Sequence, residues 1–435
     1  MKENSAPVAE RPSNTGMVTP AAGTGGGQGW SVVLATSLVQ AMMAFAAMTL
    51  ATIAPEVARS LDVPPALIGY QIGLVFGAGV VTALFAGTVI RRVGGCRTSQ
   101  FCLLLGGVGC AATAIPNVAA IAGGSILMGF AYGVTNPSAS HLLNRFADRR
   151  HRGLVFSIKQ AGVPVGGVLA GFVAPPLALA LGWQWVPIAV ATTLFALAAV
   201  LQRPRPRWDD DRNPTAVLRE SPLRGLRLVF MHRPVRWLSI GGGLYAMVLL
   251  SLTGYLVTLL VEEVGFSLVE AGIVLSTVQV GATVARLAWG WLADRTRDGL
   301  GVLLVIGLIM LVATLATSQL SPAWPPLAVR IVLIVFGIGA IGWVGVFYAE
   351  LARLSPEGEV GTITGGALAL TYGGTLLGPS LFALTHGAVG SYTTSFALLA
   401  IVAAAGTTCM ALSRKTQSNP LRPLGGEGGE RKRAG

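Results

Sequence analysis

A few cationic side chains that fall inside long apolar segments are the residues of this sequence best suited to chemistry. Lys159 and Gln160 lie about six residues into the segment 154–178, and Arg286 lies near the end of the segment 267–292. A charge within a membrane is costly unless it faces a cavity or has a partner. Both cations can donate hydrogen bonds to an anion, which Gln160 would help to orient. We therefore expect these three residues to bind an anionic substrate.

Both cations also have a structural interpretation. Lys159 is close enough to one end of its segment to extend its ammonium group back to the membrane surface. Arg286 precedes Asp294 by eight residues, about 12 Å along a helix, near the same end of its segment. Glu350 is a candidate partner for Arg286 at that end. Substrate binding is thus one of two interpretations at each position.

Acidic side chains are missing from the middle third of every apolar segment. The nearest candidates for proton coupling are Glu350 and His141, both close to the ends of their segments. A basic cavity without acids favours an anionic substrate over a cationic drug, because charge complementarity selects partners. A coupled proton would then travel with the substrate's own carboxylate, or charge would be balanced by exchange.

Neutral polar and aromatic side chains in other apolar segments complete the candidate site. They are Gln40, Tyr132, Asn136, Tyr245, Gln279, Trp343 and Tyr372. For each of them, a hydrogen bond between packed helices is at least as good an explanation as contact with a substrate.

The elements that must position these residues are long apolar helices. Of the 435 residues, 53% are hydrophobic and 11% are charged, whereas about a quarter of residues are charged in soluble proteins. About 20 apolar residues cross a bilayer as a helix, and this length predicts twelve spans. They are 31–54, 66–90, 99–116, 118–142, 154–178, 183–201, 237–261, 267–292, 300–319, 326–350, 361–385 and 393–412. The predicted fold class is an all-α polytopic membrane protein with twelve transmembrane helices.

The net charge is +12, and most of the basic residues lie in alternate loops between these segments. Lys and Arg concentrate near 91–97, 145–152 and 203–236, whereas the alternate loops near 56–62 and 262–270 carry most of their charge as acids. The positive-inside rule then places both termini in the cytoplasm, in a bacterial-type inner membrane. The basic excess is a signal of topology, and we expect no nucleic acid as a partner.

Composition divides the chain into five parts. Residues 1–29 are rich in Gly, Pro, Ser and Thr and predict a disordered cytoplasmic tail. An N-terminal six-helix bundle spans 30–201, a cytoplasmic linker 202–236, and a C-terminal six-helix bundle 237–412. A basic cytoplasmic tail, 413–435, completes the chain.

Motifs for enzymatic chemistry are missing from the sequence. We find no phosphate-binding GK[ST] loop, no HExxH and no convincing setting for a nucleophile. The four cysteines lack metal-type spacing. We expect neither an enzyme nor a cofactor or metal, and without a nucleotide site we do not expect ATP-driven transport within this chain.

A short charged motif ends the segment 267–292. It reads GWLADR and contains Gly290, Asp294 and Arg295. A counterpart nearly half the chain earlier reads GTVIRRVGG, in which Gly87 and Arg92 match and an arginine replaces the aspartate. A second pair of glycines, at the start of the segments 154–178 and 361–385, recurs at almost the same offset. A duplicated six-helix unit is therefore predicted.

On these motifs, the chain resembles the major facilitator superfamily of transporters, whose loops between helices 2 and 3 and between helices 8 and 9 carry this type of signature. The segments GWVGVFYAELARL and GTITGGALALTYGGTLLGP also resemble the tenth and eleventh helices of prokaryotic members. The resemblance implies two halves around a central cavity that open alternately to each side. It also implies that Gly87, Arg92, Gly290, Asp294 and Arg295 belong to gating loops.

We therefore predict a secondary transporter, expected to be a monomer in the lipid bilayer. Its substrate would be a small organic anion such as a carboxylate, moved by proton symport or exchange. Efflux of a drug or metabolite by proton antiport is the alternative, which an uncharged aromatic cavity would favour. A non-transporting membrane sensor or scaffold is a remote alternative, because the tails and linker are too short for a large folded domain.

Overall fold

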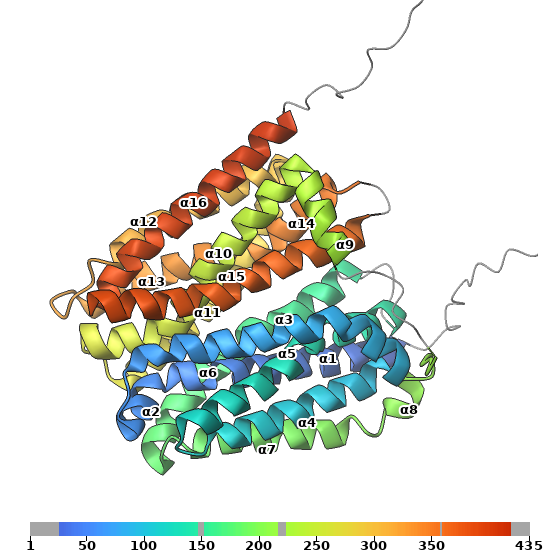
Figure 1. Cartoon of the computed structure of the whole chain (residues 1–435), viewed down its shortest axis with the longest axis horizontal. Coiled ribbons are helices and arrows are strands. Elements are labelled where there is room, and N and C mark those ends of the chain that lie inside the picture. The colour runs from blue at the N-terminus through green and yellow to red at the C-terminus, as the bar shows by residue number, and fades with distance from the viewer. Residues whose placement is uncertain (1–25, 147–151, 216–222, 357–358, 419–435) are drawn as a thin grey trace, which may run out of the picture.

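The structure is a computed structural model, and it describes residues 26–146, 152–215, 223–356 and 359–418. Within these ranges, the chain is built from helices (Figure 1). The N-terminal half contains α1 (Gly26–Thr52), α2 (Ala54–Leu61), η1 (Pro65–Leu67), α3 (Ile68–Val93), α4 (Gly95–Thr113), α5 (Val118–Phe146), α6 (Arg152–Leu181) and α7 (Trp185–Val200). The C-terminal half contains α10 (Arg233–Leu259), η3 (Leu260–Val264), α11 (Leu268–Thr296), α12 (Gly299–Thr317), α13 (Pro326–Ala340), α14 (Val344–Leu354), α15 (Val360–Val389) and α16 (Tyr392–Ser418).

Each predicted span coincides with helical structure, but the segment 326–350 is divided into two helices by a turn at 341–343. Ten helical spans of the described chain are long and apolar enough to cross a membrane. The other two predicted spans correspond to α4 and to the shorter apolar helix α7. The chain is therefore an integral membrane protein.

Different short helices lie at the two ends of the bundle. The short linker helices α8 (Arg205–Trp208) and α9 (Leu223–Met231) lie at one end, together with the beginning of α1, and α2 lies at the other (Figure 1). The end of α16 belongs to the α8 side, since Arg414 forms an ion pair with Asp298 between α11 and α12. We call the first the linker end and the second the α2 end.

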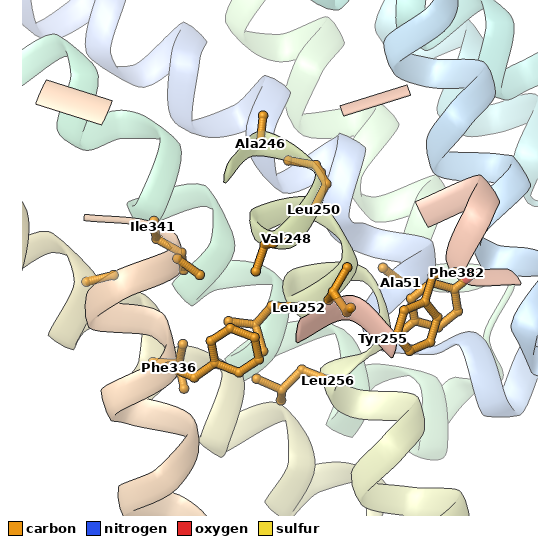
Figure 2. Packing of buried hydrophobic residues seen from close by; sticks show 14 of the residues in the cluster. Ala51, Ala246, Val248, Leu250, Leu252, Tyr255, Leu256, Phe336, Ile341 and Phe382 are labelled. Carbon is orange, nitrogen blue, oxygen red and sulfur yellow. The ribbon is translucent and has the colours of Figure 1, made fainter. Parts of the chain in front are cut away.

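Helix α10 is the most deeply buried part of the C-terminal half. Its Leu252 and Leu256 face Phe336 of α13, and its Tyr255 lies against Phe382 of α15 (Figure 2). The two rings stack with their centroids 4.3 Å apart. Most residues of α10 are buried between the other helices, which gives this helix its central place.

Contact between the halves is concentrated toward the α2 end. There the Tyr255 hydroxyl can donate to the carbonyl oxygen of Ala66 at 2.9 Å or to that of Pro379 at 3.0 Å. On the opposite side of the interface, Gly171 of α6 faces Gly272 of α11. A Cβ atom added to either glycine would lie 2.4 Å or less from the other's carbonyl oxygen. Only glycine allows two helix backbones to approach this closely.

Toward the linker end, the predicted gating residues have more space. A Cβ atom added at Gly87 or Gly290 would meet no atom within 4 Å. Arg92 and Asp294 are exposed, and so is Arg295, whose guanidinium lies 5.8 Å from the Trp291 ring centroid. These glycines thus differ from Gly171 and Gly272, which contact each other across the two halves.

An acidic run of the linker is attached to the N-terminal half. Asp209 is buried, and its two carboxylate oxygens accept the backbone N–H groups of Cys96 and Arg97 at 2.7 and 2.9 Å. It thereby caps the N-terminus of α4 from a distant part of the sequence. Asp210 and Asp211 form ion pairs with Arg145 at the end of α5.

Asp209→Ala should lower the free energy of unfolding by about 1–2 kcal/mol, because two buried N–H groups lose their acceptor. Asp209→Asn keeps one acceptor and should lose less.

Burial raises the pKa of the Asp209 carboxyl above its ordinary value, and this effect outweighs the two N–H donors, which lower the pKa. Wild-type stability should therefore fall as pH rises through that folded-state pKa, and the Asn variant should lack this slope. Thermal unfolding in detergent between pH 4 and 8 measures both effects, and equal stability of the three proteins would contradict the cap.

Candidate functional site

A cavity of about 420 Å³ lies between the two halves. Its walls come from α1, α3, α5 and α6 of the N-terminal half and from α10, α11, α14, α15 and the turn at 341–343 of the C-terminal half. The cavity is thus lined by residues of both halves.

The structure brings the predicted binding residues together, with one exception. Those that line the cavity are Gln40, Tyr132, Asn136, Lys159, Gln160, Gln279, Arg286, Trp343 and Tyr372. Tyr245 does not line it. Its hydroxyl donates to the carbonyl oxygen of Leu303 at 3.0 Å, and its ring packs edge-on against Trp343 with centroids 5.7 Å apart. Tyr245 therefore supports the cavity wall from behind.

Lys159 is held inside the protein and does not extend to the membrane surface. Only 1% of the residue is exposed, and its ammonium group donates to the side-chain oxygens of Asn136 and Gln160. Both partners are neutral, and the described chain provides no carboxylate within ion-pair distance of Lys159. Its positive charge is therefore uncompensated and faces the cavity.

Arg286 contacts the C-terminal half of the same cavity. One of its terminal N–H groups donates to the Ile341 carbonyl oxygen at 3.2 Å, while its buried Nε lacks a hydrogen-bond partner. The predicted pairing of Arg286 with Glu350 is wrong. Glu350 pairs with Arg353, one turn later on α14, and packs against Gly299 at the linker end. A helix places residues three apart on one face, which decides that pairing.

The two candidates for proton coupling lie outside the cavity lining. His141 is 2.8 Å from Asp211 of the linker. Glu350 is engaged by Arg353, as described above. Their places at the linker end follow from their positions near the ends of α5 and α14.

The cavity is basic and partly aromatic. Its described lining contains Lys159 and Arg286 but no Asp or Glu. Residues that sequence reasoning missed complete the wall, namely Phe76, Phe156, Tyr348, Thr253, Thr364, Thr371 and Thr375. Phe76 and Tyr132 meet edge-on with ring centroids 5.5 Å apart. Nothing in the sequence distinguishes these side chains from ordinary core residues, since only the packing of the helices orients them inward.

Comparison with known proteins defines the class. The family model of the Major Facilitator Superfamily matches residues 36–379. The chain belongs to this superfamily, and it is a membrane transporter rather than an enzyme.

Curated relatives are transporters as well. The chain is 30% identical over 344 residues to the 3-(3-hydroxy-phenyl)propionate transporter of Escherichia coli (strain K12), covering 75% of this chain and 81% of the relative. It is 28% identical over 257 residues to the probable nitrate/nitrite transporter NarK2 of Mycobacterium tuberculosis (strain ATCC 25618 / H37Rv), covering 57% of this chain and 61% of the relative.

Solved structures share the fold. A bacterial homolog of the human lysosomal transporter Spinster, in an inward-facing and occupied conformation, superposes with a TM-score of 0.74 at 16% identity, covering 92% of this chain and all of the other. The peptide transporter POT in complex with sulfate gives a TM-score of 0.72 at 13% identity, covering 90% and 94%.

Proposed function

We propose that this transporter moves a small organic anion, a carboxylate, through its central cavity. One observation carries the proposal: the cavity holds two cations, Lys159 and Arg286, and its described lining has no acid. Lys159 belongs to the N-terminal half and Arg286 to the C-terminal half. An anion bound between them would attract both halves and would offset the cost of burying Lys159 without a counter-ion.

Alternating access then follows from the unequal ends of the bundle. The contacts at the α2 end would close that side of the cavity, and the linker end would be open. We place the linker end and both termini in the cytoplasm on the distribution of basic residues. In this arrangement, an anion enters or leaves on the cytoplasmic side, and rocking of the halves exposes it on the other.

Charge balance is the second part of the proposal. The candidates Glu350 and His141 lie outside the cavity lining. A coupled proton would therefore cross on the carboxylate of the substrate itself, or one anion would exchange for another. Proton symport and anion exchange are both consistent with this cavity, because Lys159 and Arg286 are the charged residues of its described lining.

The names of the relatives support an anionic substrate and indicate its chemical class. The substrates in the names of the Escherichia coli and Mycobacterium tuberculosis proteins are a propionate that carries an aryl group and two inorganic anions. The rings of Phe76, Tyr132, Tyr348 and Tyr372 would contact the aromatic part of such an acid. The same rings are the observation that favours the alternative, efflux of an aromatic drug or metabolite by proton antiport.

Counterflow uptake into proteoliposomes tests the proposed function. The panel contains labelled 3-phenylpropionate, 3-(3-hydroxyphenyl)propionate, nitrate, the cationic dye ethidium and glucose. We expect saturable uptake of a carboxylate, with ethidium and glucose at the level of empty vesicles. Uptake of ethidium in place of carboxylates would favour the alternative, transport of an aromatic drug, and no uptake of any carboxylate would contradict the proposed substrate class.

A further inference from the structure

The turn that divides α13 from α14 releases backbone carbonyl groups inside the membrane-spanning bundle. Between Ala340 and Val344 the helix is interrupted, so the carbonyls before the turn lose their usual helical donors. Within a membrane, such groups need donors from neighbouring helices or from a cavity that they border. The described turn contains neither proline nor a positive φ angle that would explain the interruption.

Three side-chain N–H groups take the place of the missing backbone donors. The indole of Trp289 donates to the carbonyl oxygen of Ile338 at 3.1 Å, and the indole of Trp343 donates to that of Ala340 at 3.0 Å. The third is Arg286, which donates to Ile341 at 3.2 Å. The interruption is thus capped by one cation and two tryptophans.

Gly342 makes the approach of Trp289 possible. A Cβ atom at this position would lie 2.4 Å from the Ile338 carbonyl oxygen and 2.8 Å from Cδ1 of Trp289. The glycine therefore brings the indole against the turn.

The turn connects two environments. Arg286, Ile341 and Trp343 line the central cavity. Trp289 lies outside that lining, in a separate apolar groove of α11 and α13 that also contains Ile338. Trp289 therefore does not contact the cavity itself, but its indole bonds the turn that borders the cavity.

We propose that Trp289 is a positioning residue for anion binding: by holding the Ile338 carbonyl, it fixes the turn so that the Ile341 carbonyl orients Arg286. This inference rests on the proposed function. One guanidinium N–H of Arg286 donates to the Ile341 carbonyl oxygen. Because the guanidinium is planar, its remaining N–H groups then have a fixed direction in which they can bind a carboxylate. If the capped turn favours anion binding by Arg286, linkage requires that a bound anion also favours the capped turn. An anion on Arg286 therefore stabilises the turn and the position of α14.

The test compares Trp289→Phe with Trp291→Phe. Both changes keep an aromatic ring and remove one indole N–H, but Trp291 is 64% exposed and packs with Arg295 through its ring. The probe is labelled 3-phenylpropionate, and KM and kcat are measured in proteoliposomes. We expect Trp289→Phe to raise KM about three- to tenfold, the effect of one lost hydrogen bond, with kcat changed less. The Trp291→Phe variant should match wild type.

A double-mutant cycle with Arg286→Gln distinguishes positioning from general damage. If Trp289 acts through Arg286, its effect on KM should disappear once Arg286 is glutamine. An effect that persists unchanged, or a Trp289→Phe variant that behaves like the control, would overturn the inference. If Arg286→Gln itself leaves KM unchanged while the carboxylate is still taken up, Arg286 is not part of the anion site and the inference fails, whereas the proposed carboxylate substrate stands.

Hydrogen exchange provides a readout that does not depend on the substrate. Amides in residues 338–348 should exchange faster in Trp289→Phe than in wild type or Trp291→Phe, because the turn loses a cap. Unchanged exchange would refute the capping role even if wild-type protein takes up no 3-phenylpropionate. In that case the failure of uptake counts against the proposed substrate, and exchange decides whether Trp289 caps the turn.

Discussion

Lys159→Ala should reduce kcat/KM for carboxylate uptake at least about thirtyfold, because loss of one partner from a buried charge pair costs about 2 kcal/mol or more. The same change should leave the melting temperature in detergent equal to that of wild type or raise it. Lys159 is 1% exposed and bonds only to neutral groups, so the unliganded protein bears the cost of its desolvated charge. Residues retained for binding commonly reduce stability in this way.

The control for this prediction is Arg59→Ala, which also removes one positive charge. Arg59 is exposed and pairs with Glu56 at the α2 end, outside the cavity lining. Its loss should leave uptake within about twofold of wild type, because exposed ion pairs contribute little. Two results would contradict a binding role for Lys159: uptake that survives its removal, or a fall in melting temperature of several degrees that identifies it as structural.

Gly272→Ala should impair transport about tenfold or more, although it adds a single methyl group. The new Cβ would lie 2.2 Å from the carbonyl oxygen of Gly171, a backbone atom that can move only with its helix. Overpacking of this kind costs about 1–3 kcal/mol, and the cost falls on the state in which α6 and α11 touch. Its population should drop by about one to two orders of magnitude.

Labelling of Ser276→Cys measures this shift without reference to a substrate. Ser276 is 6% exposed at the α6–α11 contact, and its hydroxyl donates to Val168 at 3.0 Å. The four native cysteines are buried, which keeps the background low. A bulky maleimide should react faster when Gly272 is alanine. Gly123→Ala is the matched control, since its Cβ would meet no atom within 4 Å. Equal labelling in the two backgrounds would show that this contact does not open.

Hydropathy and charge were sufficient to predict the helices. A helix that crosses a bilayer needs an apolar run of about 20 residues, and basic residues concentrate in alternate loops between such runs. The span predicted at 326–350 is one apolar span in the structure, but two helices form it, and contacts with another helix accompany the interruption. Trp289 and Arg286 come from α11 and satisfy carbonyls of the turn. Hydropathy averages over a window and does not register such donors, so the two helices there look like one.

Most of the candidate site could also be predicted from the sequence. A lysine or arginine in an apolar helix is conspicuous because its burial needs a reason, and this led to Lys159 and Arg286. Their partners could not be predicted in the same way. Arg286 pairs with a backbone carbonyl rather than with Glu350, since rotation and depth of the helices decide which groups meet.

What the sequence by itself determined is the class of the protein, its helices, and the cations of its site, because these depend on composition and spacing along one chain. Only the tertiary structure decided that Tyr245 stands behind the wall, that Phe76 and Tyr348 enter it, and that the halves touch at Gly171 and Gly272. Side chains of one type are equivalent in a sequence. They differ in function only once packing between helices has turned each toward a cavity, a neighbour or the lipid.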